Sequence, residues 1–274
     1  MRTIAFLNQK GGCGKSSSCF HLSGAFAQNG WRVLLVDADP QGSLSQGFLG
    51  SELVENLPST ATVAAAFEGD ELLVASESLV RPTSFSNISI IPANYTLAQF
   101  NQPSPERLGL QQFALSSLLD GIQGFDVVLV DCPPNLYLCS WAALLAAEFV
   151  VIPGPPEDFG TQGLRVVHEA IGHARLMNPS LNVLGHLVTR SDSRLLVHQV
   201  YEQTLRQLFG NTVFETVIPE AVAFKVALAC RQPVGYYTTR SSAARLTLQL
   251  SREMQHRMDA FTGEAGRVTY GHRA

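Results

Sequence analysis

The feature that most constrains this chain is a glycine-rich turn near its start, inside the stretch FLNQKGGCGKSSSCFHL at residues 6–22. An apolar run at residues 3–8 precedes the turn, and a segment of helical period at residues 14–28 follows it. Glycines let backbone N–H groups surround an anion, and the N-terminus of a helix adds positive charge. A strand, this turn and a helix, in that order, predict a phosphate-binding loop.

Two of the three lysines of the chain, Lys10 and Lys15, lie on either side of this turn, and the third is Lys225. Lys15 is expected to extend along bound phosphates, and the hydroxyl of Ser16 to bind Mg²⁺. The strict pattern G-x-x-x-x-G-K-[ST] needs a glycine where this chain has Gln9. The loop is therefore a variant of the usual phosphate-binding motif.

Apolar runs alternate with segments of helical period along the rest of the chain. Further strands are expected at residues 32–39, 87–94, 127–132, 148–154 and 182–189. Crossover helices are expected near residues 106–122, 136–147, 161–176 and 196–209, and a last helix at 241–260. Near-continuous apolar strands are typical of a parallel sheet covered on both faces. The order predicts a doubly wound α/β fold of one domain, residues 1–260, followed by a frayed tail at 261–274.

Composition narrows the class of protein. Of the 274 residues, 46% are apolar and 15% charged, which is typical of a chain with a large buried core. The net charge of −4 gives no global reason to expect a nucleic acid or an anionic membrane as partner. No apolar stretch reaches the roughly 18 residues of a membrane span. We expect a cytoplasmic protein with buried, reduced thiols at Cys13, Cys19, Cys132, Cys139 and Cys230.

The stretch KGGCGKSS at residues 10–17 resembles the deviant Walker A motif of the ParA/MinD superfamily of ATPases. The resemblance implies a P-loop NTPase fold, ATP and Mg²⁺ as cofactors, and slow intrinsic ATP hydrolysis. In that family the early lysine, here Lys10, reaches the nucleotide of the partner subunit, so ATP holds a homodimer together. The residues expected to hold the phosphates are Gly11, Gly12, Cys13, Gly14, Lys15, Ser16 and Ser17.

Two later stretches extend the resemblance. LLVDADPQG at residues 34–42 is similar to the second motif of the family, in which Asp39 would position the attacking water and Asp37 would lie near the metal. FDVVLVDCPPNL at residues 125–136 resembles its Walker B-like strand, with Asp131 holding the water shell of Mg²⁺. The continuation DPQG favours the ParA branch over the MinD branch. A short chain without an N-terminal helix-turn-helix that reads DNA resembles the small, Soj-like type of that branch.

Less specific stretches add further candidates. VTRSD and VIPEAV lie where family members hold adenine, which suggests Thr189 and Pro219. By resemblance, Glu157 is an interface residue or a neighbour of the nucleotide. The segment 60–69 is either a short helix that contacts a partner or ordinary packing.

The resemblance also implies nonspecific DNA and a stimulating partner, either ParB-like or another adaptor, for a protein that associates with the nucleoid and positions cargo. Relatives often read IPRNVR where this chain has Glu220 and Ala223 in place of two basic residues. Residues 223–258 nevertheless contain six basic side chains and one acidic one, Glu253, which indicates either a phosphate-binding surface or a solvated helix. The DNA-binding candidates are Arg194, Lys225, Arg245 and Arg252.

Three other classes share the loop. A MinD-like ATPase that cycles on membranes needs a C-terminal amphipathic helix, and this chain ends with little apolar face. Nitrogenase-type iron proteins need cysteines that bridge a cluster, whereas Cys132 and Cys139 are read as packing residues. Cobyrinate amidoligases usually have a further amidotransferase portion, for which this chain is short. The histidines show no ligand spacing, and Trp31 and Trp141 are expected to pack.

Overall fold

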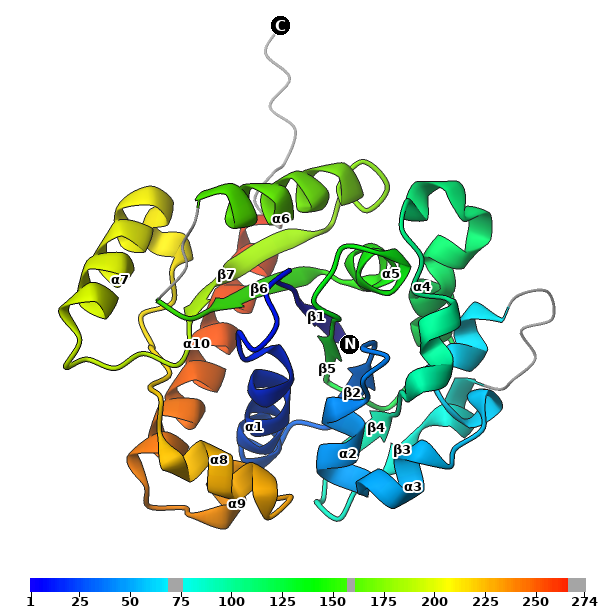
Figure 1. The fold of residues 1–274 in the computed structure, drawn as a ribbon, viewed down its shortest axis with the longest axis horizontal. Helices are drawn as coiled ribbons and strands as arrows, with labels where there is room; N and C mark the ends of the chain where they lie inside the picture. The colour runs from blue at the N-terminus through cyan, green and yellow to red at the C-terminus, as the bar shows by residue number, and fades with distance from the viewer. Residues whose placement is uncertain (69–75, 157–160, 266–274) are drawn as a thin grey trace, which may run out of the picture.

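The structure of the protein is a computed structural model that describes residues 1–68, 76–156 and 161–265. A seven-stranded sheet has the order β3-β4-β2-β5-β1-β6-β7 (Figure 1). Six strands pair in parallel, and each expected strand is confirmed within a few residues. Their bounds are β1 Arg2–Phe6, β2 Val33–Asp37, β4 Ile88–Ile91, β5 Val127–Asp131, β6 Phe149–Gly154 and β7 Asn182–Val188. The unpredicted edge strand β3, Arg81–Pro82, is antiparallel to β4.

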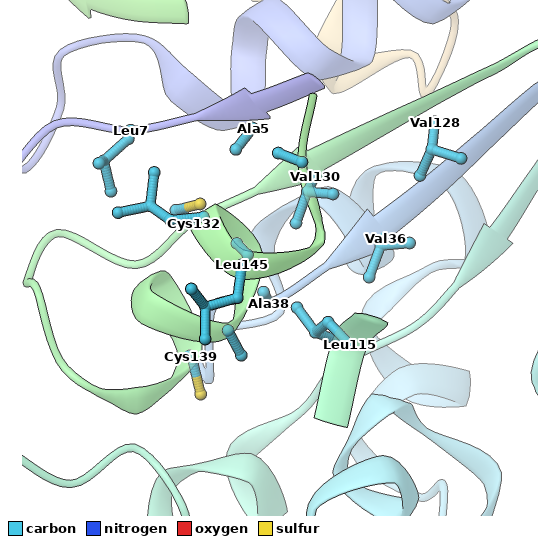
Figure 2. Packing of buried hydrophobic residues seen from close by; sticks show 14 of the residues in the cluster. Ala5, Leu7, Val36, Ala38, Leu115, Val128, Val130, Cys132, Cys139 and Leu145 are labelled. Atoms are coloured by element: carbon cyan, nitrogen blue, oxygen red, sulfur yellow. The ribbon is translucent and has the colours of Figure 1, made fainter. Parts of the chain in front are cut away.

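Helices cover both faces of the sheet, which confirms the doubly wound α/β prediction (Figure 1). Alternate residues of each strand point to opposite faces, as the pleat requires. Val128 and Val130 face a core built with α4 Ala114–Asp120, α5 Leu138–Ala146 and α6 Thr161–Ala174. Figure 2 shows part of this core, where Cys132 and Cys139 lie among aliphatic side chains.

The opposite face of the sheet holds the second core. Val127 and Leu129 face it, together with α1 Lys15–Gln28, α2 Ser43–Leu49 and α10 Ser242–Ala265. Helix α1 starts directly after the glycine-rich turn and ends before Gly30, whose φ of 86° gives the left-handed stop that the sequence predicted. The loop that ends β1 is thus held between the sheet and a helix buried in the core.

Several helices differ from their predictions. The helix expected at 106–122 is two short 3₁₀ turns, Pro105–Arg107 and Gly109–Phe113, followed by α4, because Gly109 takes a left-handed φ of 55°. Helix α10 continues to Ala265, past the expected end at 260, and the rest of the predicted tail lies outside the described residues. Short helices that the sequence did not reveal are α2, α3 Ser51–Glu55, α8 Val222–Ala229 and α9 Val234–Tyr237. Helix α7, Leu196–Phe209, has the predicted bounds.

Smaller predictions have mixed outcomes. Four cysteines are buried as expected, but Cys230 is exposed because it follows the last turn of α8 at the surface. In the segment 60–69 the 3₁₀ helix Val63–Phe67 is buried, which supports packing. Trp31 packs on Phe26, with ring centroids 5.3 Å apart. No helix in the described part of the chain has the length and apolar character needed to cross a membrane.

Candidate nucleotide-binding site

The carboxyl ends of three neighbouring parallel strands bring the motif residues together. Strand β5 lies between β1 and β2, and Asp131 is in register with Phe6 on one side and with Asp37 on the other. In open α/β sheets, ligands bind at this edge, where the strand order reverses. A cavity of about 430 Å³ opens here, lined by the residues 11–18, Asp39, Thr189 and Pro219 among others.

The glycine-rich loop has the backbone conformation of a phosphate cradle. Gly12 and Gly14 take left-handed φ angles of 70° and 92°, which side chains with a Cβ rarely adopt. Lys15 is only 6% exposed, and its Nζ donates to the carbonyl of Lys10 at 3.1 Å. The ammonium group also lies 3.7 Å from Cys13 Sγ. Lys15 is therefore folded over the loop at the place where an anion would be bound.

Asp131 is a buried carboxyl group with unsatisfied oxygens. Its side chain is fully buried, and neither oxygen accepts a well-formed hydrogen bond within the described residues, although Ser16 and Lys15 lie near it. Burial and the neighbouring Asp37 raise the pKa of Asp131 well above its usual range, and Ser16 and Lys15 offset only part of this. An unpaired buried carboxyl is costly, so the site fits a hydrated cation such as Mg²⁺.

Asp37 differs from Asp131 because neighbouring groups already donate hydrogen bonds to both of its carboxylate oxygens. One oxygen accepts hydrogen bonds from Ser45 N at 2.9 Å and from Ser45 Oγ at 2.7 Å, and the other accepts one from Asp39 N at 3.1 Å. Burial raises the pKa of Asp37 to about 7. The metal role expected for Asp37 remains a prediction, and the observed contacts give it a structural one, which is to fix the start of α2 and the backbone of Asp39.

Asp39 lines the cavity itself. Its side chain is 8% exposed, and Oδ1 accepts a hydrogen bond from Gln41 N at 3.0 Å. The turn continues through Gly42, whose φ is 62° and where an added Cβ would lie 2.6 Å from the carbonyl oxygen of Ala93. The glycine of the DPQG motif is thus required by backbone geometry, and it holds Asp39 at the edge of the sheet.

The other end of the cavity is mostly apolar. Thr189 Oγ1 donates to the carbonyl of Cys13 at 2.8 Å, so the residues after β7 contact the phosphate loop directly. Thr189 and Pro219 both line the cavity, and their predicted contact with adenine stays a prediction. Neighbouring cavity residues that the sequence did not indicate are Arg190, Ile218, Phe224 and Leu228. Glu157 lies outside the described residues.

The predicted DNA-binding cations differ in their ion pairing, and their role in DNA binding stays a prediction. Arg194 pairs with Asp192 at 2.7 Å, and Lys225 pairs with Glu220. Arg245 and Arg252 are exposed, and their spacing of seven residues places them on one side of α10.

Arg257, another cation of the basic stretch at residues 223–258, has a structural role. Arg257 donates to the carbonyls of Leu184 and Val213 at 3.2 and 2.8 Å, and it pairs with Glu253 at 2.9 Å. Its guanidinium carbon lies 4.3 Å from the centre of the Phe214 ring. The basic count of this stretch therefore overstates the charge that is available to a partner.

The histidine and cysteine side chains outside the cavity lie in different surroundings. Within the described residues, no group of three or more His, Cys, Asp or Glu side chains is arranged to hold a metal ion. Cys132 and Cys139 are buried packing residues, as expected. His168 is half-buried: its Nε2 lies 3.2 Å from Nε2 of His186, and its ring stacks on Phe209.

Comparison with known proteins identifies the family to which this chain belongs. A family model described as an AAA domain matches residues 1–183. The chromosome-partitioning ATPase Soj of Thermus thermophilus is 34% identical over 94% of this chain and 97% of its own. The sporulation initiation inhibitor protein Soj of Bacillus subtilis is 32% identical over 92% of this chain and 98% of its own.

Solved structures agree on the fold. McdA from Cyanothece superposes with a TM-score of 0.79 at 21% identity, over 93% of this chain and 99% of that one. A cobyrinic acid a,c-diamide synthase from Mycobacterium smegmatis, with a bound ATP analogue and magnesium, gives 0.78 at 24% identity over 95% and 97%. The Soj sequences, at higher identity, carry the assignment: this chain belongs to the ParA/MinD superfamily of ATPases, in its small, Soj-like ParA branch.

Proposed function

We propose that the protein binds ATP with Mg²⁺ in the cavity at the end of β1, β2 and β5 and hydrolyses it. The observation that carries this proposal is the unsatisfied pair of Asp131 oxygens beside a buried Lys15 that is folded over the loop. A cation at Asp131 and a triphosphate at Lys15 would each satisfy a group that is costly to bury alone. Mg²⁺, when bound, neutralises charge on the phosphates.

Different residues of the chain bind the phosphates, hold the metal and orient the water. Loop amides and Lys15 hold the phosphates, and Ser16 and Asp131 are the residues that would hold the metal. Asp39, fixed by its hydrogen bond from Gln41 and by Asp37, orients the attacking water. Phosphoryl transfer needs positioning and charge stabilisation more than covalent chemistry, so these groups suffice for slow hydrolysis.

Lys10 completes the site from a second subunit. Among the described residues, those that line the cavity begin at Gly11, and the carbonyl of Lys10 accepts a hydrogen bond from Lys15 Nζ. The motif that this chain shares with its family places the early lysine, here Lys10, on the nucleotide of a facing copy. ATP then holds a homodimer together, and hydrolysis, accelerated by a ParB-like or other adaptor protein, separates it.

Light scattering of the wild type and Lys10→Ala, each with MgATP and with MgADP, tests this step. The wild type should dimerise with ATP alone, and Lys10→Ala should stay monomeric while it still binds ATP. An ATP-dependent Lys10→Ala dimer that hydrolyses ATP normally would contradict the proposal.

The dimer associates with nonspecific DNA, and so with the nucleoid, through exposed cations such as Arg245 and Arg252. The relatives named as chromosome-partitioning ATPases support this role, and a cargo is moved or positioned as a result. DNA affinity of the ATP-bound protein should fall steeply with salt, because each phosphate contact releases counterions. A membrane-cycling, MinD-like protein would instead pellet with anionic liposomes in ATP and show no affinity for DNA.

A further inference from the structure

We infer that Arg190 and Glu220 form a latch across the rim of the nucleotide cavity that slows nucleotide release, an inference that rests on the proposed function. Arg190 follows the last strand, β7, and takes a left-handed φ of 54°. Its Nη1 donates to the carbonyl of Gly12 at 3.1 Å, and its Nε donates to Glu220 Oε2 at 2.9 Å. We call these two contacts the rim latch.

The latch joins segments that are far apart in the sequence. Gly12 belongs to the phosphate loop, Glu220 stands just before α8, and both line the cavity. The planar guanidinium of arginine presents several donors in a fixed fork, so one side chain can hold both partners at once. The shorter lysine ammonium, a single point of charge, cannot reproduce this arrangement.

Glu220 is itself held in place. Its backbone N–H donates to the carbonyl of Ser191 at 2.9 Å, and its Oε1 pairs with Lys225 of α8. The pKa of Glu220 lies below its usual value because Lys225 and Arg190 both stabilise its carboxylate. The latch therefore connects the phosphate loop, the segment after β7 and the first turn of α8.

The latch lies along the path of a bound nucleotide. Arg190, Glu220 and Lys225 line the same cavity as the phosphate loop, and the apolar residues Ile218 and Phe224 lie beside them. A nucleotide that filled both the phosphate end and the apolar end would pass along this rim. Opening the rim separates Gly12 from α8, and that separation breaks the contacts of Arg190.

The strength of the latch suits control of a rate rather than permanent closure. The side chains of Arg190 and Glu220 are 53% and 33% exposed, so water and salt weaken their attraction. Exposed ion pairs contribute up to about 1 kcal/mol, which corresponds to about fivefold in a rate. The latch should therefore retard nucleotide release severalfold at low salt and lose this effect at high salt.

Stopped-flow fluorescence tests the latch. Dissociation of a fluorescent mant-ADP with Mg²⁺ is measured for the wild type, Arg190→Lys, Glu220→Gln and the double variant. Arg190→Lys keeps the positive charge and removes the fork. The matched controls are Arg165→Lys and Glu169→Gln, which alter an exposed ion pair of the same kind on α6, at 2.7 Å.

Each latch variant should release mant-ADP about threefold to fivefold faster at ~50 mM salt, and the double variant no faster than the faster single one. Salt near 500 mM should speed release from the wild type and leave the variants unchanged. Wild-type release rates in Arg190→Lys, slower release from Glu220→Gln, or effects that multiply would overturn the latch while leaving the proposed function standing. Failure of the wild type to bind mant-ADP would overturn both.

Discussion

The phosphate end of the cavity and the basic stretch at residues 223–258 differ in how their charged side chains are paired. Lys15 and Asp131 are buried, and neither oxygen of Asp131 accepts a well-formed hydrogen bond among the described residues, so this end of the cavity is built for a ligand. In the basic stretch, Lys225 and Arg257 already pair with carboxylates. Burial without a partner identifies a ligand site more surely than a count of surface charges does.

The largest expected effect is at the phosphate end. Lys15→Ala should lower ATP hydrolysis by about 100-fold or more, because the ammonium stabilises charge on the phosphates in the transition state. A phosphate-release assay measures the loss, and Arg165→Ala, on the exposed side of α6, serves as control. If Lys15→Ala kept half of the wild-type turnover, Lys15 would not stabilise the phosphates, and the contrast with the basic stretch would fail.

Backbone geometry at the same end gives the next effect. Gly42→Ala should lower the free energy of unfolding by about 3 kcal/mol, because a Cβ would clash with the Ala93 carbonyl in a left-handed conformation. Gly30→Ala is the matched control, with a similar φ of 86° and open space around it. It should cost only about 1 kcal/mol. Equal losses in urea unfolding would show that the contact with Ala93 is unimportant.

The basic surface gives a smaller effect. The double variant Arg245→Ala/Arg252→Ala should weaken binding of the ATP-bound protein to DNA about tenfold and reduce the salt slope by about 2. Arg257→Ala, by contrast, should lower thermal stability and leave the salt slope unchanged, because this side chain is held by Leu184, Val213 and Glu253. Fluorescence anisotropy over a salt series measures both slopes, and a wild-type slope in the double variant would exclude α10 as the DNA surface.

The smallest effect concerns pH. The pKa of Asp37 rises from 3.8 to about 7 on folding, so its contribution to stability is present below pH 4 and is lost as the pH rises toward 7. The protein without nucleotide should therefore lose stability across this window. Asp37→Asn, which cannot ionise, should flatten this trend by several degrees in Tm. An identical pH profile for the variant, by differential scanning calorimetry, would contradict the assignment.

What the sequence could predict follows from how local each interaction is. Strand β1, the glycine turn and α1 are contiguous, and their backbone and burial patterns are set by neighbouring residues, so fold and phosphate loop were both predicted. The sequence does not show that Asp131 is buried between β1 and β2 with both of its oxygens unsatisfied.

Long-range partners explain most of what was missed. Arg190 contacts Gly12 across 178 residues, and nothing near either position signals the contact. Arg257 was counted as available charge because its carbonyl partners lie at Leu184 and Val213, far away in the chain. The helix expected at 106–122 failed for a local reason, since Gly109 interrupts an otherwise periodic pattern.

The most direct test of the account is calorimetric titration of ATP into the wild type and Asp131→Asn, each with and without Mg²⁺. We expect Mg²⁺ to strengthen ATP binding to the wild type by at least tenfold and to have no effect on Asp131→Asn, whose fold should persist because the amide has the shape of the carboxyl group it replaces and carries no charge. Equal enhancement by Mg²⁺ in both proteins would show that the buried carboxyl does not hold the metal, and the proposed site would be wrong.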